Sequence, residues 1–280
     1  MTPREPPATQ RTGVSTRACT LPDGRTVAYA LAGDPTGTPL VLHHGTPGSR
    51  LFAAVCDSTA TEAGVRLVAP DRPGYGRSSP PPRGWSMANW GDDVRELLAT
   101  EEIAAETPVR VPHVGFSGGG PFALAAATPG DRVGLVGTVV PPAETGLARL
   151  ASIPFAVRLL FRLSKPLARL RGAEAVVNQY TDRSVSPAVA DAVAADFREA
   201  LRQGASAVAR EARLFAEVSI DRESDGLTVR AWHGFDDENA PIGPVRELLD
   251  EVNGTVIPVE SDHLGTFLDR QRDIFDWATG

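Results

Sequence analysis

Short apolar runs alternate with amphipathic runs over most of the chain. The apolar runs have the length and bounding turns of strands, and those predicted are 27–31, 40–43, 65–69, 109–114, 133–140, 228–232 and 255–259. The amphipathic runs predict helices, chiefly 50–63, 86–100 and 122–127, the last placed directly after Pro121. Alternating strands and helices predict an α/β fold with a parallel sheet covered on both faces.

The alternation stops between about Thr145 and Ser219, where the pattern is helical and rich in Ala, Leu, Val and Arg. We interpret 145–219 as a helical cap inserted before a later strand, at the sheet edge where such folds bind ligands. The core is then expected to comprise 15–144 and 220–280. The polar, Pro/Thr-rich residues 1–14 are expected to form a disordered tail.

One stretch of this insertion, 147–171, has two interpretations because it mixes arginines with leucines and phenylalanines. A basic amphipathic segment can lie on a membrane surface. We favour a lid with apolar residues toward a substrate pocket and arginines in water, because the segment is internal to the fold. Pro154 and Pro166 are expected to divide it into short helices.

Composition and charge narrow the function classes. The chain has 280 residues, of which 42% are hydrophobic and 22% charged, as in ordinary soluble domains. A net charge of −7 without a basic tail disfavours a nucleic-acid partner. No apolar run is long enough to span a membrane, and the N-terminal segment lacks the apolar stretch of a signal peptide. We therefore expect a cytoplasmic protein with Cys19 and Cys56 as free thiols, although a disulfide between them stays open.

Ser117 is the first candidate for chemistry. It lies in the run Gly-Phe-Ser-Gly-Gly at 115–119, between a predicted strand and a predicted helix. A G-x-S-x-G run in that context is typical of a strained turn that projects a nucleophilic serine, with small residues required two positions before and after it. The alternative is a plain glycine-rich connection between strand and helix.

A serine hydroxyl needs a general base, and the base needs an orienting acid. Of the five histidines, only His263 lies in a loop after the last strand, at the sheet edge expected for Ser117. The acid should follow the preceding strand, where Asp236 and Asp237 are both candidates.

Developing negative charge on the substrate oxygen needs backbone donors. The residue after the nucleophile, Gly118, supplies one N–H, and Thr46 in the loop after 40–42 is expected to supply another. Gly45 and Gly48 would let this loop turn sharply, and His44 is expected to brace it by hydrogen bonding. The alternative is a simple Pro-Gly turn.

From about Thr16 to Ala278 the chain resembles the α/β-hydrolase superfamily. The matching segments are 44–48, 71–78, 115–119, the turn 234–241 and Asp262-His263, with serine, acid and histidine in the family's order. The resemblance implies an eight-stranded, mostly parallel sheet flanked by helices with a helical cap. It also selects Asp237, because the family's acid usually stands three residues after the glycine of that turn.

Two departures bear on the subfamily. Thr46 stands where proline-iminopeptidase-like members usually carry glycine. Ser117 stands where haloalkane dehalogenases and soluble epoxide hydrolases use aspartate.

The sequence thus predicts a serine hydrolase, of the carboxylic ester hydrolase type, that cleaves an ester, thioester, lactone or related acyl bond without a metal or organic cofactor. The expected partner is a small apolar acyl compound, suggested by cap phenylalanines at 155, 161, 197 and 215 that could equally be lid core. The same residues could instead support perhydrolysis, carbon–carbon hydrolysis, a lyase reaction or acyl transfer, and a ligand-binding receptor is a further alternative.

Overall fold

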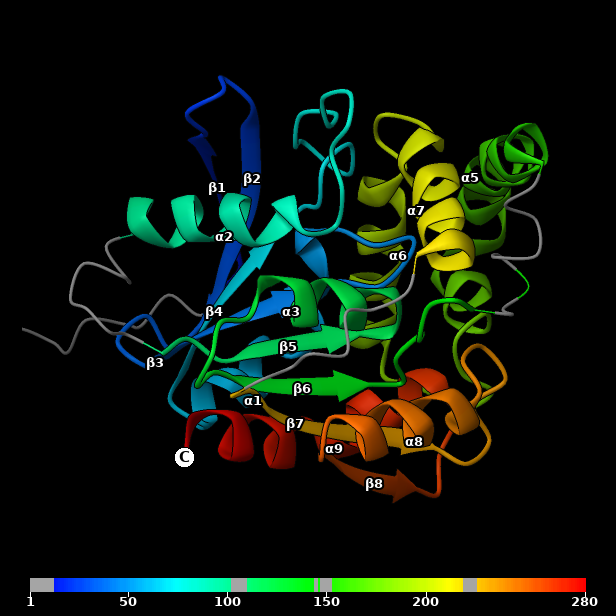
Figure 1. Ribbon diagram of the computed structural model, residues 1–280. Coiled ribbons are helices and arrows are strands. Elements are labelled where there is room, and N and C mark those ends of the chain that lie inside the picture. Colours follow the sequence, from blue (N-terminus) through cyan, green and yellow to red (C-terminus); the bar gives the residue numbers. More distant parts are fainter. Residues whose placement is uncertain (1–12, 102–109, 144–145, 147–152, 219–225) are drawn as a thin grey trace, which may run out of the picture.

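The computed structural model describes residues 13–101, 110–143, 146, 153–218 and 226–280. Its eight-stranded sheet has the order β1-β2-β4-β3-β5-β6-β7-β8 (Figure 1). Strand β2 pairs antiparallel with β1 and β4, and the other neighbours are parallel, which confirms the predicted fold class. The strands are β1 (Ser15–Thr20), β2 (Thr26–Gly33), β3 (Thr38–His43), β4 (Val65–Pro70), β5 (His113–Phe116), β6 (Arg132–Val136), β7 (Thr228–Gly234) and β8 (Thr255–Val259).

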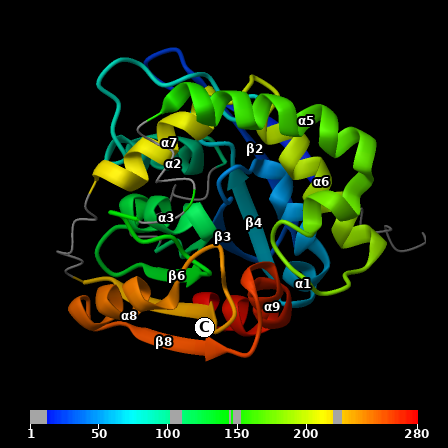
Figure 2. The ribbon, with the colours of Figure 1, turned by 90° about the vertical axis from the view of Figure 1, so that its right-hand side faces the viewer.

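Helices cover both faces of this sheet. The helices of the described chain are η1 (Arg50–Val55), α1 (Asp57–Glu62), α2 (Asn89–Thr100), η2 (Ser117–Gly119), α3 (Gly120–Ala126), α5 (Pro154–Val177), α6 (Pro187–Ala200), α7 (Ser206–Glu217), α8 (Ile242–Glu251) and α9 (His263–Thr279). Figure 2 shows α2, α3 and α8 on one face and α1 and α9 on the other. None of the described helices is both long and apolar enough to cross a bilayer.

Strand β3 is rich in apolar residues because both of its faces are covered. Leu40 and Leu42 pack into a core cluster with Phe267 of α9. Val41, between them in sequence, packs with Trp90 on the opposite face. Because successive side chains of a strand point to opposite faces, a strand covered on both sides needs apolar side chains on both faces.

Helices α5, α6 and α7 follow β6 and precede β7 in the sequence. In space they lie beyond the edge of the sheet toward which the parallel strands point (Figures 1 and 2). The prediction that Pro166 divides this region was wrong. Helix α5 continues through Pro166, and its non-helical residue is Gly172, with φ 82. A proline removes one backbone hydrogen bond, which this helix tolerates, whereas the positive φ of Gly172 interrupts the helix.

The lid interpretation expected the apolar side chains at the start of α5 to face a pocket, and several of them do not. Ile153, Phe155, Leu159 and Leu160 are exposed, whereas Val157 is buried. Residues 147–152, which belong to the same predicted stretch, lie outside the described part of the chain, as do residues 1–12 of the predicted tail.

Several boundaries also differ from those predicted. Strand β1 was not predicted from its residues, because it is an edge strand whose side chains are mostly exposed and polar. Strand β6 ends at Val136 rather than at 140, since Gly137 follows with φ 50. The helix predicted for 50–63 is a 3-10 turn followed by a short α-helix. Cys19 and Cys56 are buried free thiols.

Candidate active site

Ser117 occupies the tight turn between β5 and α3. Its φ is 54, a left-handed conformation that non-glycine residues adopt only under constraint. A Cβ added to Gly115 would lie 2.6 Å from the carbonyl oxygen of Gly119, and one added to Gly119 would lie 2.3 Å from that of His43. Only glycine fits at both positions. The turn therefore holds the half-buried Ser117 at the carboxyl edge of the sheet.

Asp237 and His263 form a buried pair at the same edge. His263 Nδ1 lies 2.7 Å from Asp237 Oδ2. The other carboxylate oxygen, Oδ1, accepts the backbone N–H groups of Asn239 at 3.0 Å and Ala240 at 2.9 Å. These bonds fix the carboxylate, which orients Nδ1–H and leaves Nε2 as the acceptor nitrogen. Asp236 is exposed and takes no part in this pair.

Gly137, just after β6, links this pair to Ser117. A Cβ at Gly137 would lie 3.1 Å from both Asp237 Oδ2 and His263 Nδ1. Two residues further on, the backbone N–H of Val139 donates to the carbonyl oxygen of Ser117 at 3.2 Å, which ties this segment to the serine turn. The ring of Phe116 also lies 4.9 Å from that of His263, centroid to centroid.

Within the described residues the hydroxyl of Ser117 makes no hydrogen bond, to His263 or to any other group. Catalytic hydrogen bonds are often long without substrate and tighten when it binds. The structure thus brings the serine turn and the His263–Asp237 pair to one place, with the serine hydroxyl unengaged.

Thr46, in the loop that follows β3, lies close to Gly118. A Cβ on Gly118 would lie 2.4 Å from Thr46 Oγ1. Gly118 is in the first turn of η2, where backbone N–H groups have no partner within the helix. Gly45 backs the serine, since a Cβ there would lie 3.5 Å from Ser117 Cβ. Gly48 closes the loop so tightly that a Cβ would lie 2.7 Å from Gly45 O.

His44 braces this loop. Its Nδ1 donates to the carbonyl oxygen of Gly45 at 2.8 Å, and its Nε2 accepts the backbone N–H of Arg72 at 3.2 Å. Burial, aided by the positive charge of Arg72, lowers the pKa of His44 well below its ordinary value. His44 is therefore neutral and structural at physiological pH.

The Arg72 side chain is buried under the same loop. Its guanidinium donates to Gly45 O at 3.0 Å, to Thr46 Oγ1 at 2.9 Å and to the carbonyl oxygen of His44. Glu211 of α7 balances the charge through bonds of 2.7 and 2.9 Å to Arg72. A buried ion pair that also binds backbone carbonyls fixes the loop conformation.

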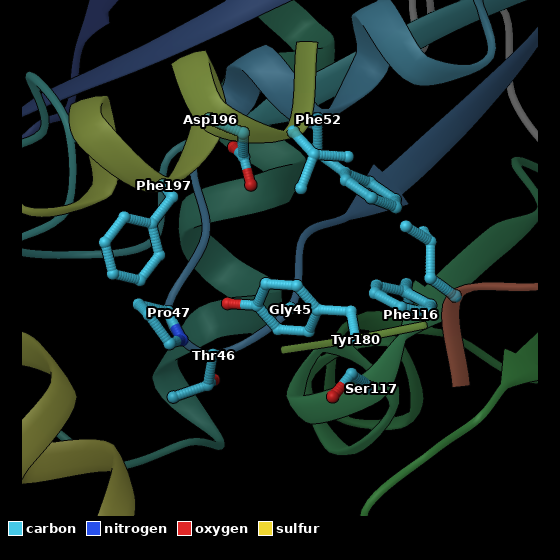
Figure 3. A pocket seen from close by; sticks show the side chains of 11 residues that line it. Gly45, Thr46, Pro47, Phe52, Phe116, Ser117, Tyr180, Asp196 and Phe197 are labelled. Atoms are coloured by element: carbon cyan, nitrogen blue, oxygen red, sulfur yellow. The ribbon is translucent and has the colours of Figure 1, made fainter. Parts of the chain in front are cut away.

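A cavity opens between Ser117 and the helices of the insertion (Figure 3). Its lining is mainly apolar, with Asp196 and Tyr180 as polar groups contributed by the insertion. The lining residues are Gly45, Thr46, Pro47, Phe52, Phe116, Ser117, Tyr180, Val193, Asp196, Phe197 and Leu264. Of the four cap phenylalanines considered above, Phe197 lines this cavity and Phe155 is exposed.

Sequence reasoning missed three side chains of the insertion that reach this region: Tyr180, Asp196 and Glu211. A signal was present for the two acids. Asp196 falls at helical spacing from the buried Val193 and Ala200, so a charge lies on an apolar helix face. Glu211 lies likewise on the buried stripe of α7. No comparable signal marks Tyr180. The described residues hold no cluster of three or more His, Cys, Asp or Glu suited to a metal ion.

Comparison with known proteins assigns the chain to a family. A family model described as "Alpha/beta hydrolase family" matches residues 40–277, and the chain belongs to this family. A non-heme chloroperoxidase from Streptomyces lividans is 36% identical over 116 residues, a match that covers 40% of this chain and 40% of that protein.

Solved structures share the fold over nearly the whole chain. An esterase from a Rhodococcus species has a TM-score of 0.67 at 24% identity, with 95% of this chain and 100% of the other covered. A bromoperoxidase from Bacillus anthracis has a TM-score of 0.69 at 22% identity, covering 94% and 98%. An enol-lactonase from Burkholderia xenovorans has a TM-score of 0.67 at 16% identity, covering 93% and 97%. At these identities the likeness establishes the fold.

Proposed function

We propose that this protein is a serine hydrolase that cleaves an ester, thioester, lactone or related acyl bond. The Ser117 hydroxyl attacks the carbonyl carbon while Nε2 of His263 accepts its proton. His263 then gives that proton to the departing alcohol, and Asp237 holds the imidazole tautomer and stabilises the imidazolium. Water, deprotonated by the same imidazole, attacks the acyl-enzyme and releases the acid.

The backbone N–H groups of Thr46 and Gly118 are the proposed donors to the oxyanion. The close approach of the Thr46 side chain to Gly118 supports this role, because two donors must lie near one oxygen. We also propose that the helices within 145–219 act as the cap, since Tyr180, Asp196 and Phe197 line the cavity above Ser117. The chemistry requires no metal or organic cofactor.

The 2.7 Å contact of Asp237 with His263, beside the positive-φ Ser117, carries the proposal. A buried acid that orients a histidine next to a serine held in a left-handed turn is the arrangement that nucleophilic acyl transfer requires.

Substitution of the nucleophile tests it directly. Ser117→Ala should lower kcat for p-nitrophenyl acetate by at least about 10³-fold and abolish labelling by a fluorophosphonate probe. Ser58→Ala, at an exposed serine of α1, should change neither. Undiminished turnover or labelling of Ser117→Ala would remove the proposal.

Perhydrolysis is the second candidate, favoured by the partial match to a non-heme chloroperoxidase. In this reaction hydrogen peroxide replaces water and attacks the acyl-enzyme; the acyl group passes from the Ser117 oxygen to the peroxide, which releases a peracid and the free serine. Supplying peroxide at increasing concentration and following the ratio of peracid to acid measures this partition. Peracid formation that requires Ser117 would support this candidate, and acid as the sole product would exclude it.

A further inference from the structure

Asp196 is a buried carboxylate that faces the proposed nucleophile across the cavity. It lies on α6 with 6% of its surface exposed, and it lines the same cavity as Ser117. Figure 3 shows its carboxylate directed into the cavity from the α6 side, with Ser117 on the opposite side. The cavity between them is otherwise mostly apolar.

The hydrogen bonds of Asp196 leave part of the carboxylate available. Oδ1 accepts both the backbone N–H and the hydroxyl of Ser49, each at 2.7 Å. Within the described part of the chain no donor meets hydrogen-bond geometry at Oδ2, although the backbone N–H of Phe52 lies close enough to favour the ionised form. Among the described residues, no Arg, Lys or His forms an ion pair with Asp196.

Keeping Asp196 ionised here is costly. Burial without a cation disfavours the charged carboxylate, and the negative charge of Asp71 adds to this. An asparagine could accept the same bonds from Ser49 through its carbonyl oxygen without that cost. The Ser49 contacts therefore do not account for an acid at this position, whereas a ligand that donates to the free oxygen would.

Tyr180 adds a second polar group to the same cavity. Its backbone oxygen accepts from Leu264 N at 2.9 Å, which fixes it beside His263, and the two rings are stacked at 6.5 Å. Within the described part of the chain its hydroxyl has no hydrogen-bond partner. Burial, with the charge of Asp196, raises the pKa of Tyr180, so the hydroxyl stays protonated and can donate.

The part of the substrate that meets these groups follows from the order of events. The alcohol must depart and water must enter, while the acyl group stays attached to Ser117. The cavity walls at Phe52, Phe197 and Leu264 are buried apolar side chains, which suit the acyl chain that stays.

We propose that Asp196 recognises a hydrogen-bond donor, a hydroxyl or an ammonium group, carried by a short acyl chain. The Tyr180 hydroxyl then donates to the lone pair of a substrate hydroxyl. This inference rests on the proposed function, and it narrows the apolar acyl substrate expected from sequence to one with a polar group on an apolar chain.

A matched ester series tests it. The substrates are p-nitrophenyl butanoate, β-hydroxybutanoate and β-aminobutanoate, which differ only in the donor. The native protein should show kcat/KM at least about tenfold higher for one or both donor-bearing esters than for butanoate. Whichever is preferred identifies the donor. Asp196→Asn should remove that preference, and Asp191→Asn, exposed on the same helix, should retain it.

A binding measurement separates this inference from the proposed function. Calorimetry on Ser117→Ala should show β-hydroxybutanamide or β-aminobutanamide binding at least about tenfold more tightly than butanamide, and the difference should vanish when Asp196→Asn is added. That result without ester turnover in the native protein would overturn the hydrolase proposal alone. Ester turnover with equal rates for all three esters would overturn the Asp196 proposal alone.

Should Asp196→Asn fail to fold, Tyr180→Phe provides the second variant. It removes only the hydroxyl, and it should lower the preference for the β-hydroxy ester without lowering that for the β-amino ester. An unchanged preference for a β-hydroxy ester in Tyr180→Phe would contradict the role given to this hydroxyl.

Discussion

The carboxylate of Glu211 on α7 accepts a hydrogen bond from the hydroxyl of Thr46, with 2.6 Å between the two oxygens. A residue of the helical insertion thus contacts the loop to which we assign an oxyanion donor. The same carboxylate neutralises the buried Arg72 and accepts from the Tyr75 hydroxyl at 2.8 Å. The position of α7 and the shape of the proposed oxyanion site are therefore mechanically linked.

Glu211→Gln should lower both stability and turnover. The variant leaves the fully buried guanidinium of Arg72 without its counter-charge, which typically costs about 3–5 kcal/mol. If Glu211 positions Thr46, kcat for p-nitrophenyl acetate should fall about tenfold or more with little change in KM, measured where the variant is still folded. Glu217→Gln, at the exposed end of α7, should match the native protein in both. A melting point shift with unchanged kcat would show that Glu211 stabilises the fold without positioning Thr46.

Gly118→Ala tests Thr46 and Gly118 as the pair of oxyanion donors. The added Cβ would lie 2.4 Å from Thr46 Oγ1 and 3.0 Å from Phe215 Cζ, so Thr46 must move. Loss of one oxyanion donor costs about 10²–10³ in kcat, and we expect a loss of that order. Gly243→Ala in α8 is the control, because its Cβ would meet nothing within 4 Å. Equal turnover by the two variants would argue against Thr46 and Gly118 as the donor pair.

Asp237→Asn and Asp236→Asn test the choice between neighbouring acids. Asp237 orients His263 through its 2.7 Å contact, whereas Asp236 is exposed. Asparagine at 237 offers an N–H where Nδ1–H needs an acceptor, so the imidazole is left in the wrong tautomer and kcat should fall by up to about 10⁴. The variant at 236 should retain native kcat. Steady-state kinetics on one ester, with melting curves for both variants, provide the comparison; a larger loss at 236 would reverse the assignment.

The parts of the site that the sequence could predict are those fixed by local geometry. Ser117 could be placed because glycines at 115 and 119 are what its turn requires. His263 and Asp237 could be placed near it because the carboxyl ends of parallel strands share one edge.

The residues that could not be predicted depend on how the insertion packs. Asp196 and Glu211 lie 79 and 94 positions beyond Ser117 in the numbering, and their contacts depend on how α6 and α7 lie on the core. Helix periodicity shows which side of a helix is buried, but it does not show what that side meets. What Asp196 and Glu211 contact is for this reason a result of the structure alone.

The raised pKa of Asp196 predicts how the free energy of unfolding depends on pH. Burial raises its pKa from an ordinary 3.8 to about 7, so between about pH 4 and pH 7 the folded state holds a proton that the unfolded state has lost. Stability from this group is fully present below pH 4 and is lost as the pH rises through 7. The loss is at most about 4 kcal/mol.

Denaturant unfolding of the native protein and Asp196→Asn at pH 5 and pH 8 measures this difference. The native protein should lose stability relative to the variant on going to the higher pH. Buried histidines such as His43 and His113 titrate in both proteins, so their effect cancels in the comparison. Asp191→Asn should follow the native curve, because this carboxyl is exposed. The opposite result, a native protein that gains stability relative to Asp196→Asn from pH 5 to pH 8, would show that a partner stabilises the charged form of Asp196. It would contradict the unpaired, buried carboxylate on which the recognition site is based.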